Sequence, residues 1–422
     1  MLTLKLLRED PGFVIERLAV KNFDAGPAVH KILDLDARRR AAQTEADALT
    51  AEQKKIASQI GRLMQEGKKD EAGVIKRLAA ESKEKVKELI ADQDLLEREL
   101  NEILVTLPNL PYKMVVPGKG AEDNVLVREG GSMPLIPDDA LPHWELAKKY
   151  DLIDFDLGVK LTGAGFPVYK GKGARLQMAL IQFFLDQNTR AGFREIMPPI
   201  LVNEDSGYGT GQLPDKGQQM YHVGLDNYYL IPTAEVPLTN IYRDTILDAG
   251  QLPVRLTAYT PCFRREAGSY GKDVRGLNRL HQFDKVEIVQ LTHPENSYSA
   301  LDQMVKHVER LVQLLKLPYR ILRLCGADLS FTSAMTYDFE VYSAAQQRWL
   351  EVSSVSNFET FQSNRLKARF RGADGKPQLV HTLNGSALAL PRIVAALLEN
   401  NQTPEGIMMP DSLHKYLHFS RI

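Results

Sequence analysis

A long segment without proline sets the first constraint on the fold. From about His30 to Leu104 the sequence contains no proline, and its only glycines are Gly61, Gly67 and Gly73. Alanine, glutamate, lysine, leucine, arginine and glutamine dominate the segment, and these residues favour helix. We therefore predict that the segment is almost entirely helical.

The spacing of apolar residues predicts that this segment forms a coiled coil. In each half, five residues follow the alternating spacing of four and three that places them along one side of a helix. These seam residues are Leu49, Gln53, Ile56, Ile60 and Leu63, then Leu89, Gln93, Leu96, Leu100 and Ile103. The stretch GRLMQEGKKDEAG (61–73) contains all three glycines and is expected to form the turn. Arms of roughly 30–35 residues then give an antiparallel helical hairpin about 50 Å long.

The charges on this hairpin are distributed unevenly. The second helix is acidic at the base of the hairpin. The outer half of the hairpin is basic and includes Lys54, Lys55, Arg62, Lys76 and Arg77. One interpretation is a solvated coiled coil with mixed charges. The other is an arm that binds the phosphate backbone of a nucleic acid. The arm has no aromatic side chains, so base stacking is not expected, and the residues alone leave both interpretations open.

Composition limits the classes of protein to consider. The chain has 422 residues and a net charge of −1, so it can hold two or more domains and has no overall charge that attracts nucleic acid. Two cysteines, Cys262 and Cys325, argue against a disulfide framework or a cysteine zinc site. Charged residues and a proline come too early for a signal peptide, and no apolar run could span a bilayer. We expect a cytoplasmic protein without a membrane partner.

The sequence changes character near Leu107, where we place a domain boundary. Residues 1–106 form the expected helical domain, and residues 107–422 alternate between helical and strand-like segments. The expected helices include 176–192 and 391–400, and the expected strands include 226–232, 254–263 and 281–291. The order has no steady strand–helix–strand repeat, which favours an α+β fold with an antiparallel sheet flanked by helices.

Two further segments lead to specific expectations. FREIMPPILV (193–202) reads as a strand, but it carries Pro198 and Pro199, and proline is confined to strand edges, starts and bulges. We therefore expect this strand to border another element, such as a partner subunit. GYGTGQ (207–212) contains three glycines and is expected to be a flexible loop.

A long charged hairpin is the strongest indication of a ligand site. The segment from Thr260 to Glu287 has strand-like ends and a loop rich in glycine and in charges of both signs, Lys272 and Asp273 among them. Ordinary hairpin turns have about two to five residues, so a loop of this length is expected to hold a ligand. Arginine clamps phosphate or carboxylate with paired hydrogen bonds, and the ligand is therefore expected to be anionic.

Alternation along strands predicts a polar pocket. Residues two apart face the same side of a strand. The sets that would share a face are Thr233 with Glu235, Arg264 with Glu266, and Phe283 with Lys285 and Glu287. A single set of this kind is commonly a satisfied salt bridge, but three sets from separate strands favour a pocket.

The segment HTLNGSALALPR (381–392) offers a phosphate site. We expect it to pass from strand to helix through Asn384, Gly385 and Ser386, with Pro391 at the first helical position. Arg392 would then lie beside the positive end of the helix, where phosphate binds readily.

These motifs resemble those of the seryl-tRNA synthetases, a family of class II aminoacyl-tRNA synthetases. The matching segments include KIASQIG, GTGQLP, IPTAEVPLTN, FRREAGS, RGLNRLHQFDKVE, TYDFEV, EVSSVSNF and LNGSALALPR. The resemblance covers nearly the whole chain. It implies activation of L-serine with ATP and transfer of the seryl group to the 3′ end of tRNA(Ser), a tRNA with a long variable arm. It also implies transfer of the seryl group to tRNA(Sec). It further implies that the coiled coil is the tRNA-binding arm, that the sheet has six or seven strands, and that GFREIMPP forms a homodimer interface.

The resemblance also implies residue roles. Arg264 and Arg392 are the expected catalytic residues: Arg264 would bind the α-phosphate and the serine carboxylate, and Arg392 the γ-phosphate. Residues expected to contact ATP are Arg264, Arg265, Glu266, Phe283, Glu351, Val352, Ser353, Ser354 and Arg392. Residues expected to contact serine are Thr233, Ala234, Glu235, Arg264, Glu287, Asn384 and Ser386.

Two of these residues are also expected metal ligands. By the same resemblance, Glu351 and Ser354 would bind the Mg²⁺ that bridges the phosphates of ATP, Glu266 would read the adenine amino group, and Phe283 would stack on the adenine. Glu351 and Ser354 differ in strand parity, so both reach one ion only if the strand bulges or ends there.

Three other functions would account for parts of the sequence. A structural coiled-coil protein would not need the charged residues of the second domain. A non-catalytic RNA-binding paralogue would not need Arg264, Glu266, Glu287 and Arg392 together. A relative that loads serine onto a carrier protein would lack the arm. Pyrophosphate exchange with serine, with and without tRNA, distinguishes these functions.

Overall fold

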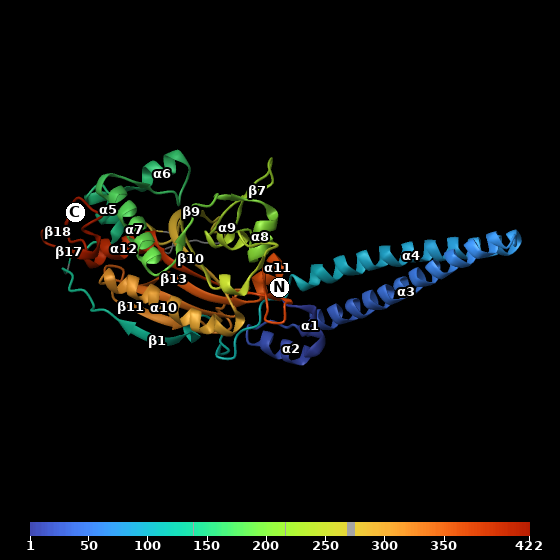
Figure 1. Ribbon diagram of the computed structural model, residues 1–422. Coiled ribbons are helices and arrows are strands. Elements are labelled where there is room, and N and C mark those ends of the chain that lie inside the picture. The colour runs from blue at the N-terminus through green and yellow to red at the C-terminus, as the bar shows by residue number, and fades with distance from the viewer. Residues whose placement is uncertain (138, 216, 268–274) are drawn as a thin grey trace. The chain divides into compact units, whose positions relative to one another are not determined.

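The fold divides into two compact units. Figure 1 shows the computed structural model, which describes residues 1–137, 139–215, 217–267 and 275–422. Unit 1 comprises Met1–Ala19 and Phe23–Pro108, and unit 2 comprises Val20–Asn22 and Asn109–Ile422. Within the described residues, no helix is long and apolar enough to cross a membrane.

Unit 1 is the expected helical hairpin. Its helices are α1 (Leu4–Glu9), α2 (Pro11–Ala19), α3 (Gly26–Gln65) and α4 (Lys69–Leu104). The long helices α3 and α4 pack antiparallel (Figure 1), which confirms the prediction. The seam residues Gln53, Ile56 and Ile60 are partly buried, whereas every residue between them is exposed. Gln53 donates across the seam to Ser82 Oγ at 3.1 Å.

The turn of the hairpin is shorter than predicted. Only residues 66–68 separate the two helices, so Gly61 lies inside α3 and Gly73 inside α4. Gly67 alone has the left-handed conformation of the turn, with φ of 80°. Charged and polar neighbours made the whole glycine-containing stretch resemble a loop, but two isolated glycines are tolerated in helices of this length.

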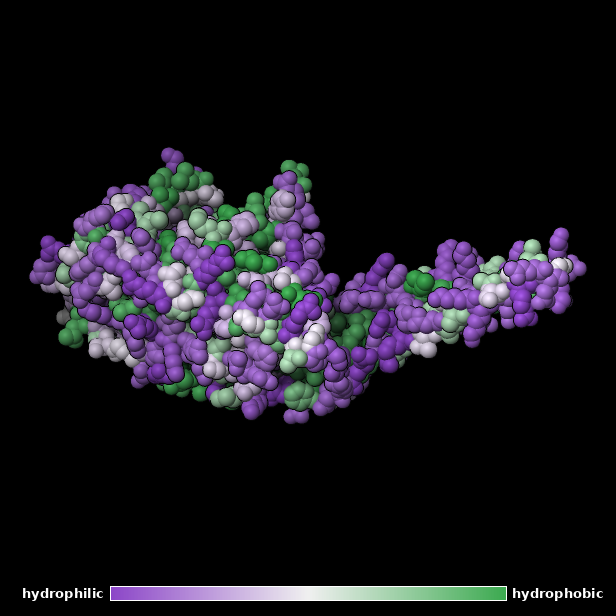
Figure 2. Space-filling view, in the orientation of Figure 1, coloured by the Kyte–Doolittle hydropathy of each residue, from purple (hydrophilic) through white to green (hydrophobic). Residues whose placement is uncertain are grey.

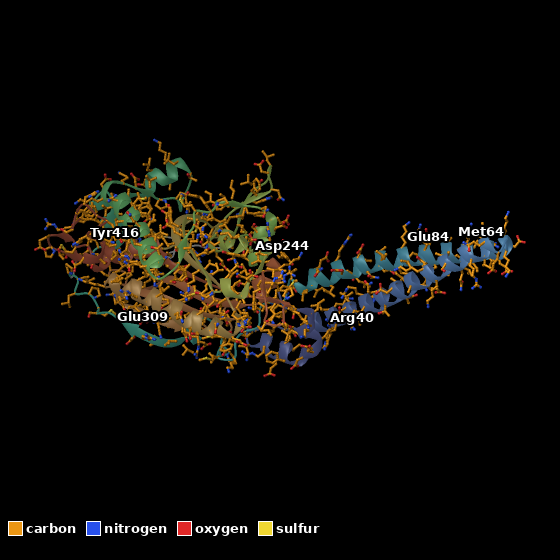
Figure 3. All side chains as sticks on the ribbon, viewed as in Figure 1. Arg40, Met64, Glu84, Asp244, Glu309 and Tyr416 are labelled. Carbon is orange, nitrogen blue, oxygen red and sulfur yellow. The ribbon has the colours of Figure 1, made fainter. Side chains whose placement is uncertain are left out.

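A buried carboxylate ties the base of the hairpin together. Asp36 is fully buried and lies 3.1 Å from Arg39 Nη2 and 3.0 Å from Arg40 Nε. Arg8 of α1 lies 3.8 Å from the same carboxylate. Figure 3 labels Arg40 near the base of α3 and Met64 near its tip. A buried charge requires such partners. Arg39 and Arg40 supply them from the same helix as Asp36, and Arg8 links α1 to α3.

Unit 2 is built on one mainly antiparallel sheet. In spatial order, its strands are β1 (Val125–Gly130), β11 (Tyr319–Arg323), β12 (Met335–Ser343), β13 (Arg348–Glu359), β16 (His381–Ala389), β10 (Gln282–Thr292), β9 (Val254–Phe263) and β4 (Arg194–Glu195). Neighbouring strands are antiparallel except β9 and β4. Among the described residues, this sheet thus has eight strands rather than six or seven, because β1 and the two-residue β4 extend its edges.

Unit 2 also contains helices, several of which pack against the sheet. They are α5 (His143–Lys149), α6 (Phe155–Leu161), α7 (Gly171–Arg190), α8 (Glu204–Thr210), α9 (Glu235–Asn240), α10 (Ser297–Leu314), α11 (Phe361–Leu366) and α12 (Leu390–Asn400). The largest apolar core lies between the sheet and α7, α10 and α12. Strand β10 sends Val286 and Ile288 into this core. Because strand residues alternate, Lys285 and Glu287 face the opposite side, where the candidate site lies.

The remaining elements are short. The strands are β2 (Ile153–Asp154), β3 (Val168–Tyr169), β5 (Leu201–Val202), β6 (Tyr221–Val223), β7 (Tyr228–Leu230), β8 (Ile246–Leu247), β14 (Arg369–Arg371), β15 (Pro377–Leu379), β17 (Gln402–Thr403) and β18 (Gly406–Ile407). The 3₁₀ turns are η1 (Ala121–Asp123), η2 (Ala249–Gln251), η4 (Pro294–Asn296) and η5 (Asp411–Leu413).

Two local predictions were wrong. The expected strand at 193–202 is split into β4, at the edge of the main sheet, and β5, in a separate three-stranded sheet, because the prolines between them cannot continue a ladder. The expected loop at 207–212 is mostly helix α8. A Cβ at Gly207 would lie 2.8 Å from Leu213, and one at Gly209 would lie 2.5 Å from Leu366. These glycines therefore permit close packing rather than flexibility.

Candidate functional site

The candidate site includes a buried polar cluster whose two charged residues lie on β10. Glu287 and Lys285 are almost fully buried, and Lys285 Nζ lies 2.7 Å from Glu287 Oε2. Lys285 Nζ also donates to Thr233 Oγ1 at 2.8 Å, and Thr233 Oγ1 donates to Glu287 Oε2 at 3.3 Å. Ser386 of β16 pairs directly with Glu287 across the sheet. The structure thus brings together Thr233, Glu287 and Ser386, three of the residues expected to contact serine.

A second carboxylate lies beside this cluster. Glu235 is the first residue of α9 and is buried. Burial, and then the nearby charge of Glu287, raise the pKa of Glu235 to about 7. Gln362 of α11 donates to Glu235 Oε1 at 2.6 Å, and Thr382 of β16 donates to Gln362 at 2.7 Å. A carboxylate held in this way is ready to accept a cationic group.

The route by which Thr233 and Glu235 meet differs from the prediction. They are not on a strand: the chain turns at 232–234 and enters α9. Thr233 Oγ1 instead accepts the backbone N–H of Glu235 at 3.2 Å. Arg264 and Glu266 likewise follow the end of β9, and Glu266 has a positive φ of 49°. Strand alternation therefore applies only to the set on β10.

The residues expected around adenine have partners within the protein. The guanidinium carbon of Arg264 lies 5.3 Å from the centre of the Phe283 ring, a cation–π contact. Arg279 Nε lies 2.8 Å from Glu266 Oε2. These contacts gather two arginines, one glutamate and one aromatic ring at the ends of β9 and β10. Such a group can bind an anionic ligand that carries a flat ring.

The expected metal ligands meet through a strand irregularity. The pairing of β12 with β13 shifts register between Glu351 and Ser353, so Val352 forms a bulge. Ser354 Oγ donates to Glu351 Oε1 at 3.3 Å. The condition set by the sequence, that the strand must bulge for both side chains to approach one point, is thus met. Arg392 Nη1 donates to the Glu351 carbonyl at 2.6 Å and lies 3.7 Å from its carboxylate.

Several expected contact residues can offer only backbone atoms. Ala234, Val352 and Ser353 are buried, and Ser353 Oγ donates to the Ser386 carbonyl at 2.6 Å.

The path into α12 also differs from the prediction. Asn384 and Ser386 lie within β16, which continues to Ala389. Helix α12 begins at Leu390, so Pro391 takes its second position rather than its first.

The strand pattern did not identify several residues of the site. Gln362 and Arg279 lie outside the three sets. Arg279 belongs to the same charged hairpin as Glu266, but no signal in the sequence joined Gln362 to Glu235. Asp338 of β12 pairs with Ser354, and its Oδ1 is buried with no hydrogen-bond partner among the described residues. Burial, and then the charge of Glu351, raise the pKa of Asp338 well above its usual range. Within the described residues, no group of three acidic, histidine or cysteine side chains could hold a metal ion.

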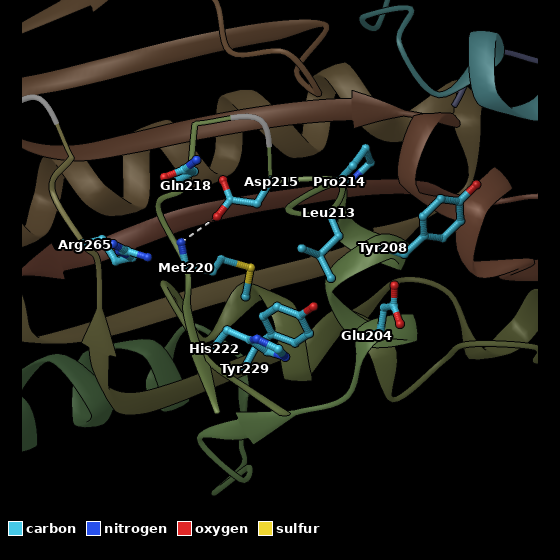
Figure 4. Close-up of a pocket in the computed structure, with 10 residues that line it drawn as sticks. All are labelled: Glu204, Tyr208, Leu213, Pro214, Asp215, Gln218, Met220, His222, Tyr229 and Arg265. Carbon is cyan, nitrogen blue, oxygen red and sulfur yellow. Dashed lines mark hydrogen bonds between the residues drawn. The ribbon is translucent and has the colours of Figure 1, made fainter. Parts of the chain in front are cut away.

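A cavity of about 450 Å³ lies within unit 2 (Figure 4). It is lined by Glu204, Tyr208, Leu213, Pro214, Asp215, Gln218, Met220, His222, Tyr229 and Arg265. Asp215 Oδ2 accepts the Met220 N–H at 2.8 Å, and the Arg265 N–H donates to the Gln219 carbonyl at 2.8 Å. Arg264 and Arg265 therefore have different surroundings: one lies over Phe283 and the other forms part of this cavity. Lys272 and Asp273, in the loop that follows, lie outside the described residues.

The basic residues of the arm are presented to solvent. Lys54, Lys55, Arg62, Lys76 and Arg77 are all exposed, and most of the arm surface is hydrophilic (Figure 2). Arg62 lies 3.3 Å from Glu66, whereas the other four make no ion pair with any described residue. Their charges are therefore accessible to an anionic partner.

Comparisons with known proteins agree with the fold and the motifs. The family model for the seryl-tRNA synthetase N-terminal domain matches residues 1–111, and that for the class II tRNA synthetase core domain (G, H, P, S and T) matches residues 221–401. A serine–tRNA ligase from Salinibacter ruber is 50% identical over 100% of this chain and 99% of the relative. One from Chlorobaculum parvum is 45% identical over 100% of both chains.

A solved structure agrees along the whole chain. The seryl-tRNA synthetase from Pyrococcus horikoshii complexed with ATP superposes with a TM-score of 0.94 at 33% identity, covering 100% of this chain and 99% of that chain. A prolyl-tRNA synthetase from Giardia lamblia shares the fold over 64% of this chain, with a TM-score of 0.56. Full-length similarity to serine–tRNA ligases, together with both family models, shows that this chain belongs to the seryl-tRNA synthetase family.

Proposed function

We propose that this protein joins L-serine to tRNA(Ser) in two steps, by forming seryl-adenylate from serine and ATP and then transferring the seryl group to the 3′ end of the tRNA. The observation that carries the proposal is the buried cluster of Thr233, Lys285 and Glu287 opposite Ser386, within a chain that resembles serine–tRNA ligases over its full length. A small cluster of hydroxyls and carboxylates suits a small polar amino acid.

The proposed serine site separates the three polar groups of the substrate. Glu235, with Thr233 and Ala234 beside it, lies where the ammonium group would bind. Glu287, Asn384 and Ser386 surround the hydroxyl, and Arg264 takes the carboxylate. A carboxylate faces each donor of the substrate, and an arginine faces its only anion. This complementary arrangement of charges is what the family resemblance implies for these residues.

The first chemical step needs no general base. The serine carboxylate is already ionised, so one of its oxygens attacks the α-phosphorus of ATP and pyrophosphate leaves. Arg264 would stabilise charge at the α-phosphate and Arg392 would bind the γ-phosphate, so the residues act by orientation and charge neutralisation. Arg265, Glu266, Phe283 and the backbone at residues 351–354 complete the proposed ATP contacts.

The residues also fit a magnesium ion. Glu351 and Ser354 approach each other through the bulge at Val352, and Mg²⁺ typically takes one or two protein carboxylates together with phosphate oxygens. When bound there, it would supply positive charge to the phosphates. Glu351 and Ser354 would supply the two oxygen ligands, and Arg392 would lie beside them.

The proposed transfer step depends on the arm. Residues 1–106 would form the tRNA-binding domain and residues 107–422 the catalytic domain. Lys54, Lys55, Arg62, Lys76 and Arg77 are exposed and would bind the phosphate backbone of tRNA(Ser) along its long variable arm, and of tRNA(Sec) in the same way. A hydroxyl of the terminal ribose then attacks the seryl carbonyl, and AMP leaves.

We also propose that the protein is a cytoplasmic homodimer. The segment at residues 192–199 includes edge strand β4, and Met197, just beyond it, is 92% exposed. An exposed apolar side chain at a sheet edge that proline leaves without further pairing is a suitable place for a second copy of the chain. Light scattering tests this proposal, and a monomeric mass at micromolar concentration would contradict it.

Two assays test the function. Serine-dependent exchange of pyrophosphate into ATP measures the first step without tRNA, and acylation of tRNA(Ser) measures both steps. We expect activity in both assays. Exchange without acylation would instead support transfer to a carrier protein, and activity in neither would support a non-catalytic RNA-binding protein.

A further inference from the structure

Lys285 lies at the centre of the polar cluster but is not among the residues expected to contact serine. Its side chain is 7% exposed, and its ammonium group lies 2.7 Å from Glu287 Oε2 and 2.8 Å from Thr233 Oγ1. It therefore contacts two of the residues that surround the proposed serine site. A lysine this deeply buried is uncommon unless it is paired.

The hydrogen bonds around Thr233 determine where its hydroxyl proton points. A hydroxyl has one donor and two acceptor sites. Thr233 Oγ1 accepts from Lys285 Nζ at 2.8 Å and from the Glu235 N–H at 3.2 Å. Both acceptor sites are used, so the proton is directed to Glu287 Oε2, 3.3 Å away. In this arrangement the hydroxyl of Thr233 has no capacity left for a substrate.

The same bonds leave Glu287 with one available oxygen. Glu287 Oε2 accepts from both Lys285 and Thr233. Among the described residues, no hydrogen bond is recorded to Oε1. The orientation of the carboxylate is therefore fixed by the lysine and the threonine, and Oε1 remains to accept a hydrogen bond from a ligand hydroxyl.

We propose that Lys285 is a specificity-determining positioning residue: through Glu287 and Thr233 it directs Glu287 Oε1 to the hydroxyl of the amino-acid substrate. The proposal rests on the proposed function, because it concerns how that function selects serine over alanine. Lys285 acts through other groups and does not itself touch the reacting atoms. Thr233 then serves as part of the support rather than as a direct contact through its hydroxyl.

A merely structural role would have different consequences. If Lys285 only compensated the charge of a buried carboxylate, its removal would lower stability and would reduce activation of every amino acid alike. A positioning role predicts that activation of serine falls more than activation of alanine, because alanine has no hydroxyl to donate a hydrogen bond to Glu287. The ratio of serine to alanine activation separates the two roles.

The test uses pyrophosphate exchange by the full-length protein with serine and with alanine, and kcat and KM are measured separately. Lys285→Met is expected to lower kcat/KM for serine by about 10²-fold or more but to change alanine activation much less, since sites built around a substrate hydroxyl discriminate by about 10⁴–10⁵. The exposed Lys306→Met is the matched control and should leave both values unchanged. A loss of equal factor for serine and alanine would overturn the proposal.

A double-mutant cycle supplies a second criterion. If Lys285 acts through Glu287, then Lys285→Met combined with Glu287→Gln should lower serine activation no further than Glu287→Gln alone, because coupled residues are not additive. The double variant also removes both buried charges together, so it should fold even where Lys285→Met does not. Multiplicative losses would show that the two residues act independently. Wild-type exchange with another amino acid but not with serine would instead contradict the proposed function.

Discussion

Replacing Glu235 with glutamine should stabilise the catalytic unit at alkaline pH while it abolishes serine activation. Glu235 is buried, and its pKa is raised from 4.5 to about 7 by burial and then by the charge of Glu287. The folded protein therefore retains a proton on this carboxyl at pH values where the unfolded chain has released it. Ionisation of Glu235 costs stability, and the amide that replaces it in the variant does not ionise.

The magnitude follows from linkage between proton binding and folding. Between pH 4.5 and 7 the unfolded state binds fewer protons than the folded state, so stability falls as pH rises. At roughly 1.4 kcal/mol per pKa unit, the loss amounts to about 1 kcal/mol at pH 5.5 and about 3 kcal/mol at pH 8. Below pH 4.5 both states are protonated and the loss disappears. The advantage of Glu235→Gln should therefore grow by about 2 kcal/mol from pH 5.5 to pH 8.

The chain offers a suitable probe for this measurement. Its two tryptophans, Trp144 and Trp349, both lie in unit 2, so their fluorescence reports urea unfolding of that unit and not of the arm. The exposed Glu405→Gln is the matched control and should show no pH-dependent difference from the wild type. An advantage for Glu235→Gln that stays constant between pH 5.5 and pH 8, or a loss of stability at pH 8, would refute the reasoning. Serine-dependent exchange should vanish, because a neutral amide cannot neutralise the ammonium group.

Three further outcomes follow from the proposed site and arm. Arg264→Ala should lower serine-dependent exchange by about 10²–10³ without loss of folding, with the exposed Arg190→Ala as control; exchange within threefold of the wild type would contradict the assignment. Deleting residues 41–99 and joining the cut ends with a short turn should leave exchange intact but abolish tRNA acylation. Binding of tRNA by the wild type should weaken steeply with salt. Normal acylation by the deletion variant would show that the arm is structural. In the wild type, alanine activation should fall far below threonine activation, because alanine leaves Glu287 without a donor, whereas the extra methyl of threonine costs only about 1–3 kcal/mol; the opposite order in exchange assays would count against the pocket.

The arm and the sheet strands could be predicted because their patterns are local. The seam of the coiled coil repeats over many turns, and β9 is a continuous strand of ten residues whose burial alternates over its second half. The turn between α3 and α4 was predicted too long, because composition does not indicate whether an isolated glycine interrupts a helix. The glycines of α8 were misread for a related reason: the contacts that require them, with Leu213 and Leu366, depend on how the chain folds back around that helix.

The candidate site was predictable in part. Glu287 and Lys285 lie on a regular strand, where alternation applies, and the need for a bulge between Glu351 and Ser354 followed from parity alone. Thr233 and Glu235 converge because the chain turns into a helix, a geometry that strand alternation does not describe. Gln362 reaches Glu235 from an element 127 residues further along the chain. Contacts of that kind depend on how distant segments pack together, and local patterns in a single sequence do not reveal that packing.

The side chains proposed to bind ATP already have partners within the protein. Arg264 lies over Phe283, Glu266 is paired with Arg279, and Arg392 donates to the Glu351 carbonyl. A nucleotide that binds here must replace these interactions, so only the surplus of its new contacts over the old ones contributes to affinity. Adenine would replace the Arg264 guanidinium on the Phe283 ring. The phosphates would give Arg392 a more strongly charged partner than the Glu351 carbonyl and the Glu351 carboxylate, which lies 3.7 Å away. The largest gain in binding free energy therefore lies at the phosphates, where charge changes during the reaction. Contacts with the phosphates should stabilise the transition state of attack on the α-phosphorus more than contacts with adenosine do.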